Sequence, residues 1–166
     1  MEHPKRRWPR WLAELLAVIA VVVAINAWHL RDAPSGPAPD FTGVLLDGTG
    51  VTLSELRGSP LLLHFWATWC PICGLQQGSI DAIAKDHTVL TVAIDADSPA
   101  AIESWMARQG VSYPVVHDPE YRLAGQYGIR GVPASFILDS AGNIRFAESG
   151  YSTGIGLRAR LWWAGL

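Results

Sequence analysis

Cysteine is scarce in this sequence: only Cys70 and Cys73 occur among its 166 residues. Two cysteines without paired histidines fall short of the four ligands that a structural zinc site needs. Residue 74 is glycine, whereas covalent haem attachment requires a histidine directly after the second cysteine. A chain of this length can bury a core of ordinary size. The two cysteines are therefore not needed as a staple for a small fold.

Charge is also low, with 13 Lys and Arg residues against 15 Asp and Glu residues and a formal net charge of −2. This balance argues against a general nucleic-acid-binding protein. The sequence after Pro39 contains neither an internal repeat nor a low-complexity segment. The length predicts one domain and a short additional segment.

A long apolar run, from Leu12 to Trp28, follows a cluster of basic residues near the N-terminus. At roughly 17 residues it lies at the short end of what spans a bilayer, and tryptophans flank it as at membrane interfaces. Because basic flanks stay in the cytoplasm, we predict a cytoplasmic N-terminus (1–10) and a transmembrane signal anchor (11–30) in the lipid bilayer. A cleaved signal peptide is the alternative, although Ala24-Ile25-Asn26 does not complete a cleavage motif.

Proline interrupts the chain directly after this apolar run, at positions 34, 37 and 39. Three prolines so close together preclude a continued helix and predict an extended tether over residues 31–39. The remaining residues, 40–166, form one predicted domain outside the cytoplasm.

The domain has a mixed α/β pattern in which apolar strand-like runs alternate with helix-like segments. Turn residues at 47–50 and 139–143 predict two β-hairpins, one at each end of the domain. The acidic residues at predicted strand ends, Asp95, Asp97 and Asp118, are expected to form a solvated rim. The predicted strands cover 41–46, 51–53, 61–67, 89–94, 115–116, 135–138 and 144–147, and the predicted helices cover 70–85, 99–109, 119–127 and 153–163.

Cys70 and Cys73 lie where the buried strand 61–67 is followed by a helix. A helix N-terminus presents unpaired N–H groups and the positive end of the dipole, and both favour the reactive thiolate. A second thiol one turn later can close a disulfide with the first. We therefore predict a redox pair in which Cys70 is the exposed nucleophile and Cys73 resolves the mixed disulfide. Copper(I) held by the two thiolates is the alternative.

Two motifs of this sequence resemble those of the thioredoxin superfamily. Residues 63–73, Leu-His-Phe-Trp-Ala-Thr-Trp-Cys-Pro-Ile-Cys, resemble its active-site signature, and residues 131–139 resemble its cis-proline loop and the strand after it. The resemblance implies a thioredoxin-like fold with an N-terminal β-hairpin extension. It also implies that Pro133 forms a cis peptide bond opposite the cysteines and that the Val132 backbone binds an incoming peptide strand.

Within the superfamily, the anchor and the N-terminal hairpin are most similar to the membrane-tethered TlpA/ResA-like oxidoreductases, including the ScsD-like branch. The cytochrome-c-maturation thioredoxins are near relatives. The resemblance implies a reductase of protein disulfides at the inner membrane that faces the periplasm, requires no cofactor and is recharged by a DsbD-type membrane partner. A disulfide oxidant or isomerase is the alternative within this class.

The sequence departs from its relatives at the acids expected near the thiols: His64, Gln76 and Ala134 occupy three such positions. We interpret His64 as a core imidazole, with a proton acceptor for Cys73 as the sharper alternative. The other residues expected around the site are Trp66 and Trp69 as platform and packing residues, Pro71 as a restraint on the turn, and Ile72, which adds no charge.

Overall fold

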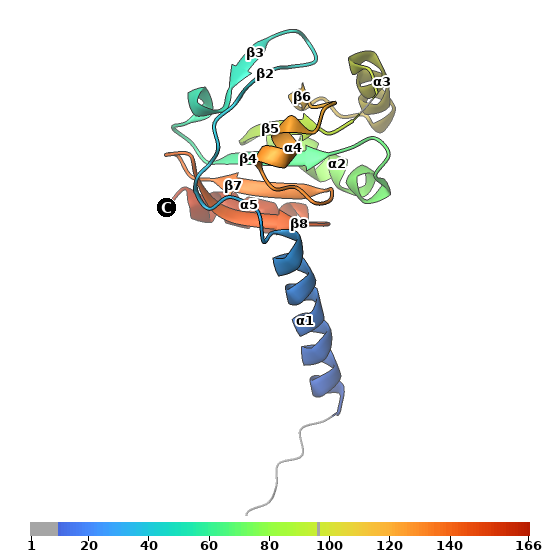
Figure 1. Ribbon diagram of the computed structural model, residues 1–166, viewed down its shortest axis with the longest axis vertical. Helices are drawn as coiled ribbons and strands as arrows, with labels where there is room; N and C mark the ends of the chain where they lie inside the picture. Colours follow the sequence, from blue (N-terminus) through green and yellow to red (C-terminus); the bar gives the residue numbers. More distant parts are fainter. Residues whose placement is uncertain (1–9, 96) are drawn as a thin grey trace, which may run out of the picture.

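The computed structural model describes residues 10–95 and 97–166. A six-stranded mixed sheet lies at its centre, in the order β1-β8-β7-β4-β5-β6, and a separate hairpin pairs β2 with β3 (Figure 1). The strands are β1 (Gly36–Pro37), β2 (Thr42–Val44), β3 (Gly50–Thr52), β4 (Leu61–Trp66), β5 (Thr88–Ala93), β6 (Val115–His117), β7 (Ala134–Leu138) and β8 (Asn143–Ser149). The helices are α1 (Arg10–His29), α2 (Pro71–Ala84), α3 (Pro99–Gln109), α4 (Arg122–Gln126) and α5 (Gly154–Ala164), with a 3-10 turn at Leu53–Leu56.

Strand β4 is the centre of the core because every one of its six residues is buried. It pairs in parallel with β5 and antiparallel with β7, so the continuous apolar run 61–66 suits a strand that is covered on both faces. Phe65 contacts Tyr127 and Phe136 with ring centroids 5.3 and 5.9 Å apart. The predicted thioredoxin-like α/β arrangement, with its N-terminal hairpin, is confirmed.

The helix predicted at 119–127 is shorter than expected, because it begins only at Arg122. Tyr121 has φ 57°, and this left-handed conformation interrupts the helical backbone. Gly125 nevertheless donates its N–H to the Tyr121 carbonyl oxygen at 2.8 Å. The pattern of apolar residues does not predict that Tyr121 adopts this conformation.

The proline-rich segment is extended, as predicted, but part of it is bound to the sheet. Gly36 and Pro37 pair with Ile144 and Asn143 of β8, and the buried Ala38 donates its N–H to the Gly142 carbonyl oxygen at 2.9 Å. Proline is tolerated there because β1 is an edge strand. The sheet therefore begins at Gly36, ahead of residue 40.

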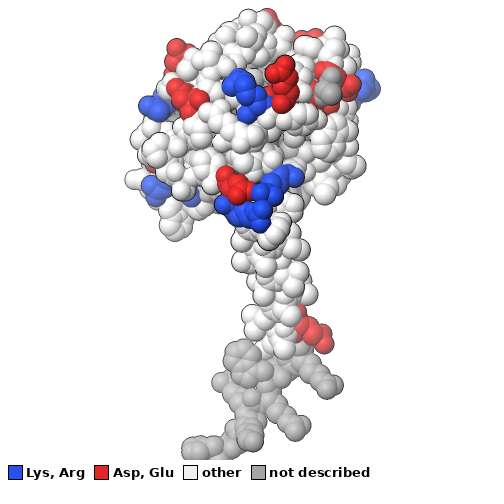
Figure 2. Space-filling model, viewed as in Figure 1, with Lys and Arg blue, Asp and Glu red and all other residues white. Residues whose placement is uncertain are grey.

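α1 projects from the domain as a single long helix (Figure 1). Its segment Trp11–His29 has a mean hydropathy of 2.1 and none of it is buried, which makes it a candidate membrane span. The predicted cytoplasmic N-terminus lies outside the described residues, except for Arg10. Figure 2 shows that charged side chains gather where α1 meets the domain, whereas most of the helix surface is uncharged.

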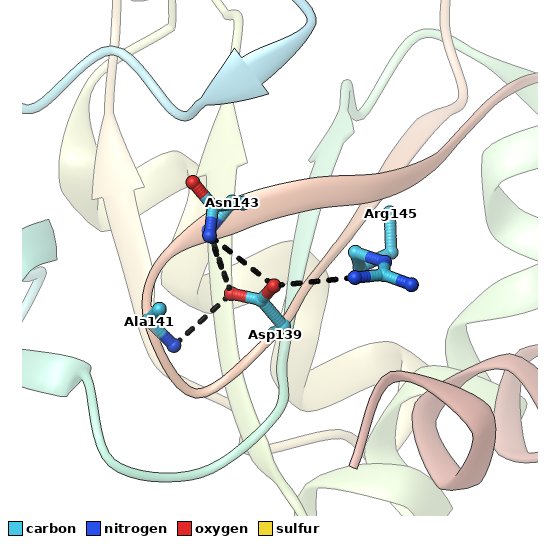
Figure 3. A network of polar contacts seen from close by, with 4 residues as sticks. All are labelled: Asp139, Ala141, Asn143 and Arg145. Carbon is cyan, nitrogen blue, oxygen red and sulfur yellow. Dashed lines mark hydrogen bonds and ion pairs between the residues drawn. The ribbon is translucent and has the colours of Figure 1, made fainter. Parts of the chain in front are cut away.

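The turn between β7 and β8 is organised by the carboxylate of Asp139 (Figure 3). Its Oδ1 accepts hydrogen bonds from the backbone N–H groups of Ala141 and Asn143 at 3.0 and 2.8 Å, and Arg145 lies 3.7 Å from Oδ2. Burial raises the pKa of Asp139, but the hydrogen bonds from Asn143 and Ala141 outweigh it, so the pKa lies below its usual 3.8.

We expect Asp139→Ala to lower the free energy of unfolding by about 1–2 kcal/mol at neutral pH, because two backbone donors lose a charged acceptor. Since the folded-state pKa is lowered, this contribution is present above the unfolded-state pKa and is lost as the pH falls through the folded-state value. The difference from the parent protein should therefore shrink below about pH 4. Urea unfolding of the full-length protein in detergent micelles measures both effects.

Asp47→Ala is the matched control, because Asp47 caps the exposed β2–β3 turn through a single backbone N–H, that of Thr49 at 2.8 Å. Asp47→Ala should lower the free energy of unfolding by less than Asp139→Ala does. Equal losses in the two variants contradict the role given to Asp139.

Candidate redox site

The two cysteines lie at the first turn of α2, where the chain leaves β4. Cys70 is the N-cap residue in extended conformation, and Pro71 follows at the first helical position. The fixed φ of proline suits a helix there, and the backbone N–H that proline lacks would have no partner within the helix. The backbone N–H of Cys73 donates to the Cys70 sulfur at 3.2 Å. Cys70 therefore receives the helix's own unpaired donor, in the way that polar N-cap side chains do.

Cys70 and Cys73 are joined in a disulfide, with Cα atoms 5.2 Å apart, a separation that suits such a bond. Cys70 retains 6% of its surface exposed and Cys73 none. Cys70 is therefore the more accessible of the two sulfurs, but in this disulfide form it is buried rather than exposed as predicted.

The loop that contains Pro133 lies against this disulfide, although it comes about sixty residues later in the chain. The Val132–Pro133 peptide bond is cis, and the Val132 carbonyl oxygen lies 3.5 Å from the Cys70 sulfur. Gly150 fixes the loop from the end of β8 by donating its N–H to the Pro133 carbonyl oxygen at 2.7 Å. The antiparallel pairing of β4 with β7 thus brings both sequence motifs to the same end of these strands.

A buried carboxylate that the sequence did not assign to the site supports the segment before Cys70. Asp95 is 1% exposed and accepts hydrogen bonds from the backbone N–H and the hydroxyl of Thr68 at 2.6 and 3.1 Å. Asp118, 4% exposed, accepts from the N–H of Ala124 at 2.9 Å. The predicted solvated rim is therefore wrong for these two residues, because loop and helix N–H groups bind their carboxylates. Only Asp97 is exposed as predicted.

His64 is fully buried in β4, and its Nδ1 lies 2.9 Å from the hydroxyl of Ser135 on β7. Its Nε2 has no hydrogen-bond partner within residues 10–95 and 97–166. Burial lowers the pKa of His64 from 6.5 to about 3, so the imidazole is neutral at physiological pH. A base this weak is poorly matched to a thiol proton, which favours the core interpretation over the proton acceptor.

Gln76 is also fully buried, one turn after Cys73. Neither end of its amide has a partner in the part of the chain that the structure describes. His64 of β4 and Gln76 of α2 are thus two buried, neutral polar side chains on the elements that flank the thiols, at positions where acids are expected in relatives.

The remaining predicted residues divide into core and surface. Trp66 is fully buried, donates to the Thr91 hydroxyl at 3.1 Å and packs on Trp105 with centroids 4.9 Å apart. Trp69 and Ile72 are exposed beside the cysteines, at 60% and 47%. Among residues 10–95 and 97–166, no three His, Cys, Asp or Glu side chains gather to hold a metal ion.

Comparison with known proteins agrees with this geometry. The model of the AhpC/TSA family matches residues 34–147. The chain belongs to this family. It is 31% identical over 111 residues to the thiol-disulfide oxidoreductase ResA of Bacillus thuringiensis, an alignment that spans 64% of each protein, just under two thirds of that relative's length.

Two longer alignments extend the comparison. The thiol:disulfide interchange protein DsbE of Xylella fastidiosa is 31% identical over an alignment 166 positions long. This alignment covers 90% of this chain and 84% of that protein. The solved thiol:disulfide interchange protein of the thioredoxin family from Chlorobium tepidum superposes with a TM-score of 0.67 at 30% identity, covering 80% of this chain and 97% of that one. The predicted resemblance to thioredoxin-like and ResA-like oxidoreductases is confirmed.

The buried imidazole generates a test based on acid stability. As the pH falls below 6.5, the unfolded chain protonates residue 64 and the folded protein, with its pKa of about 3, does not. Stability is therefore lost at up to about 1.4 kcal/mol per pH unit across this window. We expect His64→Leu to flatten the acid side of the stability profile, measured by urea unfolding of the full-length protein in micelles.

His87→Leu, at a half-exposed position, is the control and should retain the parent slope. A His64→Leu profile as steep as that of the parent shows that His64 is not the neutral buried group described above.

Proposed function

We propose that this protein is an anchored, extracytoplasmic thiol–disulfide oxidoreductase that acts on protein disulfides by dithiol/disulfide exchange. The observation that carries the proposal is the Cys70–Cys73 disulfide at the N-terminus of α2, with the Val132 carbonyl oxygen 3.5 Å from the Cys70 sulfur. The relatives named ResA and DsbE support it.

In the reducing direction, the Cys70 thiolate attacks one sulfur of a substrate disulfide and releases the other as a thiolate. The resulting mixed disulfide joins Cys70 to the substrate. The Cys73 thiolate then attacks the Cys70 sulfur, which forms the enzyme disulfide and releases the second substrate thiolate. Two electrons pass to the substrate, whose two sulfurs take up protons, and the protein is left oxidised.

The helix terminus is the main source of thiolate stabilisation in this scheme. The Cys73 N–H reaches the Cys70 sulfur at 3.2 Å, and the dipole of α2 adds a positive field in its first turn. Pro71 and Ile72 contribute no charge, and His64 is neutral. Substrate backbone docks on Val132 as an added strand, in the manner of β-augmentation.

Further parts of the proposal concern location and partners. The apolar helix α1 anchors the chain in the inner membrane, and the basic residues before it keep the N-terminus cytoplasmic. The proposed divisions are 1–10, 11–30, 31–39 and 40–166, except that Gly36 and Pro37 of the 31–39 segment join the sheet of the domain, which lies in the periplasm. A DsbD-type membrane protein supplies electrons, and the protein acts as a reductase.

Single replacements of the two cysteines test the assigned order of attack. We expect Cys73→Ser to accumulate a disulfide-linked complex with insulin, because Cys70 attacks and no second thiol resolves the complex. Cys70→Ser should form little of it and lose insulin reduction. Non-reducing gel electrophoresis measures the complex, and the reverse pattern in the two variants contradicts the assignment.

The reduction potential of the full-length protein tests the direction of electron flow. We expect a value near that of thioredoxin, about −270 mV, as suits a reductant. A value near that of strong oxidants, about −120 mV, makes the protein an oxidant instead. Equilibration with glutathione buffers, followed by alkylation of free thiols, provides the measurement.

A further inference from the structure

The end of α1 is fixed to the domain beside the redox site. Asn26, in its last turn, accepts a hydrogen bond from the backbone N–H of Ser149 at 3.2 Å. Asp32, just after the helix, forms an ion pair with Arg130, which precedes Val132 by two residues. The connection is therefore a contact surface rather than a free tether.

Backbone packing supports the same contact. A Cβ atom on Gly128 would overlap the carbonyl oxygen of Asp32, and the ring of His29 lies 3.8 Å from the Cβ position of Gly131. Glycine at position 128 therefore lets the chain after α1 approach the loop before Val132 closely, whereas a Cβ atom at position 131 would meet the His29 ring at an ordinary van der Waals distance. The contact thus involves backbone as well as charged side chains.

This contact determines which face of the domain lies nearest the proposed membrane. The apolar span ends at His29, and Trp28, whose ring centroid lies 4.2 Å from the guanidinium of Arg31, is of a residue type enriched at membrane interfaces. His29 and Asp32 contact the loop 128–131. This loop is followed by Val132, whose carbonyl oxygen lies beside the Cys70 sulfur. The hairpin β2–β3 lies at the opposite end of the molecule (Figure 1).

A cleft of about 540 Å³ lies between α1 and this loop. Val22 and Ile25 of α1 form one wall, and Val132 and Tyr151 belong to the other. Because Val22 and Ile25 belong to the apolar span, a soluble globular partner has no access to that wall. A chain segment that leaves the bilayer reaches both walls.

The polar end of the cleft carries Glu148 and Arg160, which form an ion pair with each other. Glu148 also accepts a hydrogen bond from the hydroxyl of Ser152 at 2.6 Å. The two charges compensate each other, so the cleft suits an uncharged, apolar segment better than a charged one.

We infer that the protein presents Cys70 to the membrane surface and that its substrates include membrane proteins with a cysteine pair just outside the bilayer. The cleft between α1 and Val132 receives the uncharged segment that joins this pair to the membrane span. The inference rests on the proposed function, because it takes for granted that α1 is in the membrane and that Cys70 exchanges disulfides.

The orientation is tested with full-length protein in phospholipid vesicles that contain head-group spin-labelled lipid. Cys70 is labelled with bimane in Cys73→Ser, and the fluorescence quenching is compared with that of Asp47→Cys in a background without Cys70 and Cys73. We expect quenching at Cys70 several times greater than at position 47. Equal quenching at the two positions overturns the inferred orientation.

An uncoupled variant provides the second comparison. Ten Gly and Ser residues inserted after Leu30, combined with Asn26→Ala, let the domain move by about 17 Å. Quenching at Cys70 should fall toward the value at position 47. Undiminished quenching shows that the contact between α1 and the domain does not set the orientation.

The substrate class is tested with a synthetic single-span peptide that has an uncharged juxtamembrane segment and a disulfide just beyond it. The same disulfide loop as a soluble peptide is the control. In the Cys73→Ser background, we expect mixed-disulfide formation with the anchored peptide to be about tenfold slower in the uncoupled variant. The reason is that Cys70 is then no longer held near the membrane surface, which lowers its effective concentration at the peptide disulfide. The soluble peptide should react equally with both.

These outcomes separate the inference from the proposed function. If neither insulin nor either peptide forms a mixed disulfide, the proposed exchange chemistry fails. If the soluble peptide reacts and the anchored peptide reacts equally with coupled and uncoupled protein, the exchange chemistry stands and the inference about membrane substrates fails.

Discussion

The sulfur of Cys70 caps the N-terminus of α2, and the Cys73 backbone N–H points at it from 3.2 Å. The rest of the site depends on this interaction. It requires that α2 begin directly after the end of β4, and Pro71 fixes the first helical position. It also requires the loop before Cys70 to be held, which the buried carboxylate of Asp95 does through Thr68.

The buried polar side chains described near the cysteines, His64 and Gln76, are uncharged. His64 is neutral because burial lowers its pKa to about 3, and Gln76 carries no charge. We therefore propose that the helix terminus, rather than a nearby acid or base, controls the reactivity of Cys70. The exposed side chains of Trp69 and Ile72 give the entrance an apolar rim, which suits contact with unfolded or extended protein segments.

Local signals made most of this arrangement predictable. The apolar run of β4 followed by Cys70 and Pro71 specifies a strand, a cap and a helix start in consecutive residues. The hairpin turns carry glycine and aspartate, as at Asp139. The role of the motif around Pro133 follows only from its resemblance to a family, since spacing alone does not show that it meets the cysteines.

The features that were not predicted depend on contacts between distant segments. Asp95 has the sequence context of a solvated strand end, and only the fold shows that Thr68 donates to it. Gly36 and Pro37 have the sequence of a linker, and only the fold shows that they pair with β8. The attachment of α1 through Asn26 and Asp32 has no local pattern, because its partners Ser149 and Arg130 are more than ninety residues away in the chain.

The central claim is that the helix N-terminus makes Cys70 the reactive thiol, and competitive alkylation measures this most directly. The reduced full-length protein is exposed to limiting iodoacetamide at neutral pH, and mass spectrometry of its peptides gives the rate of modification at each cysteine. The account predicts that Cys70 is modified much faster than Cys73. Equal rates, or faster modification of Cys73, would contradict it.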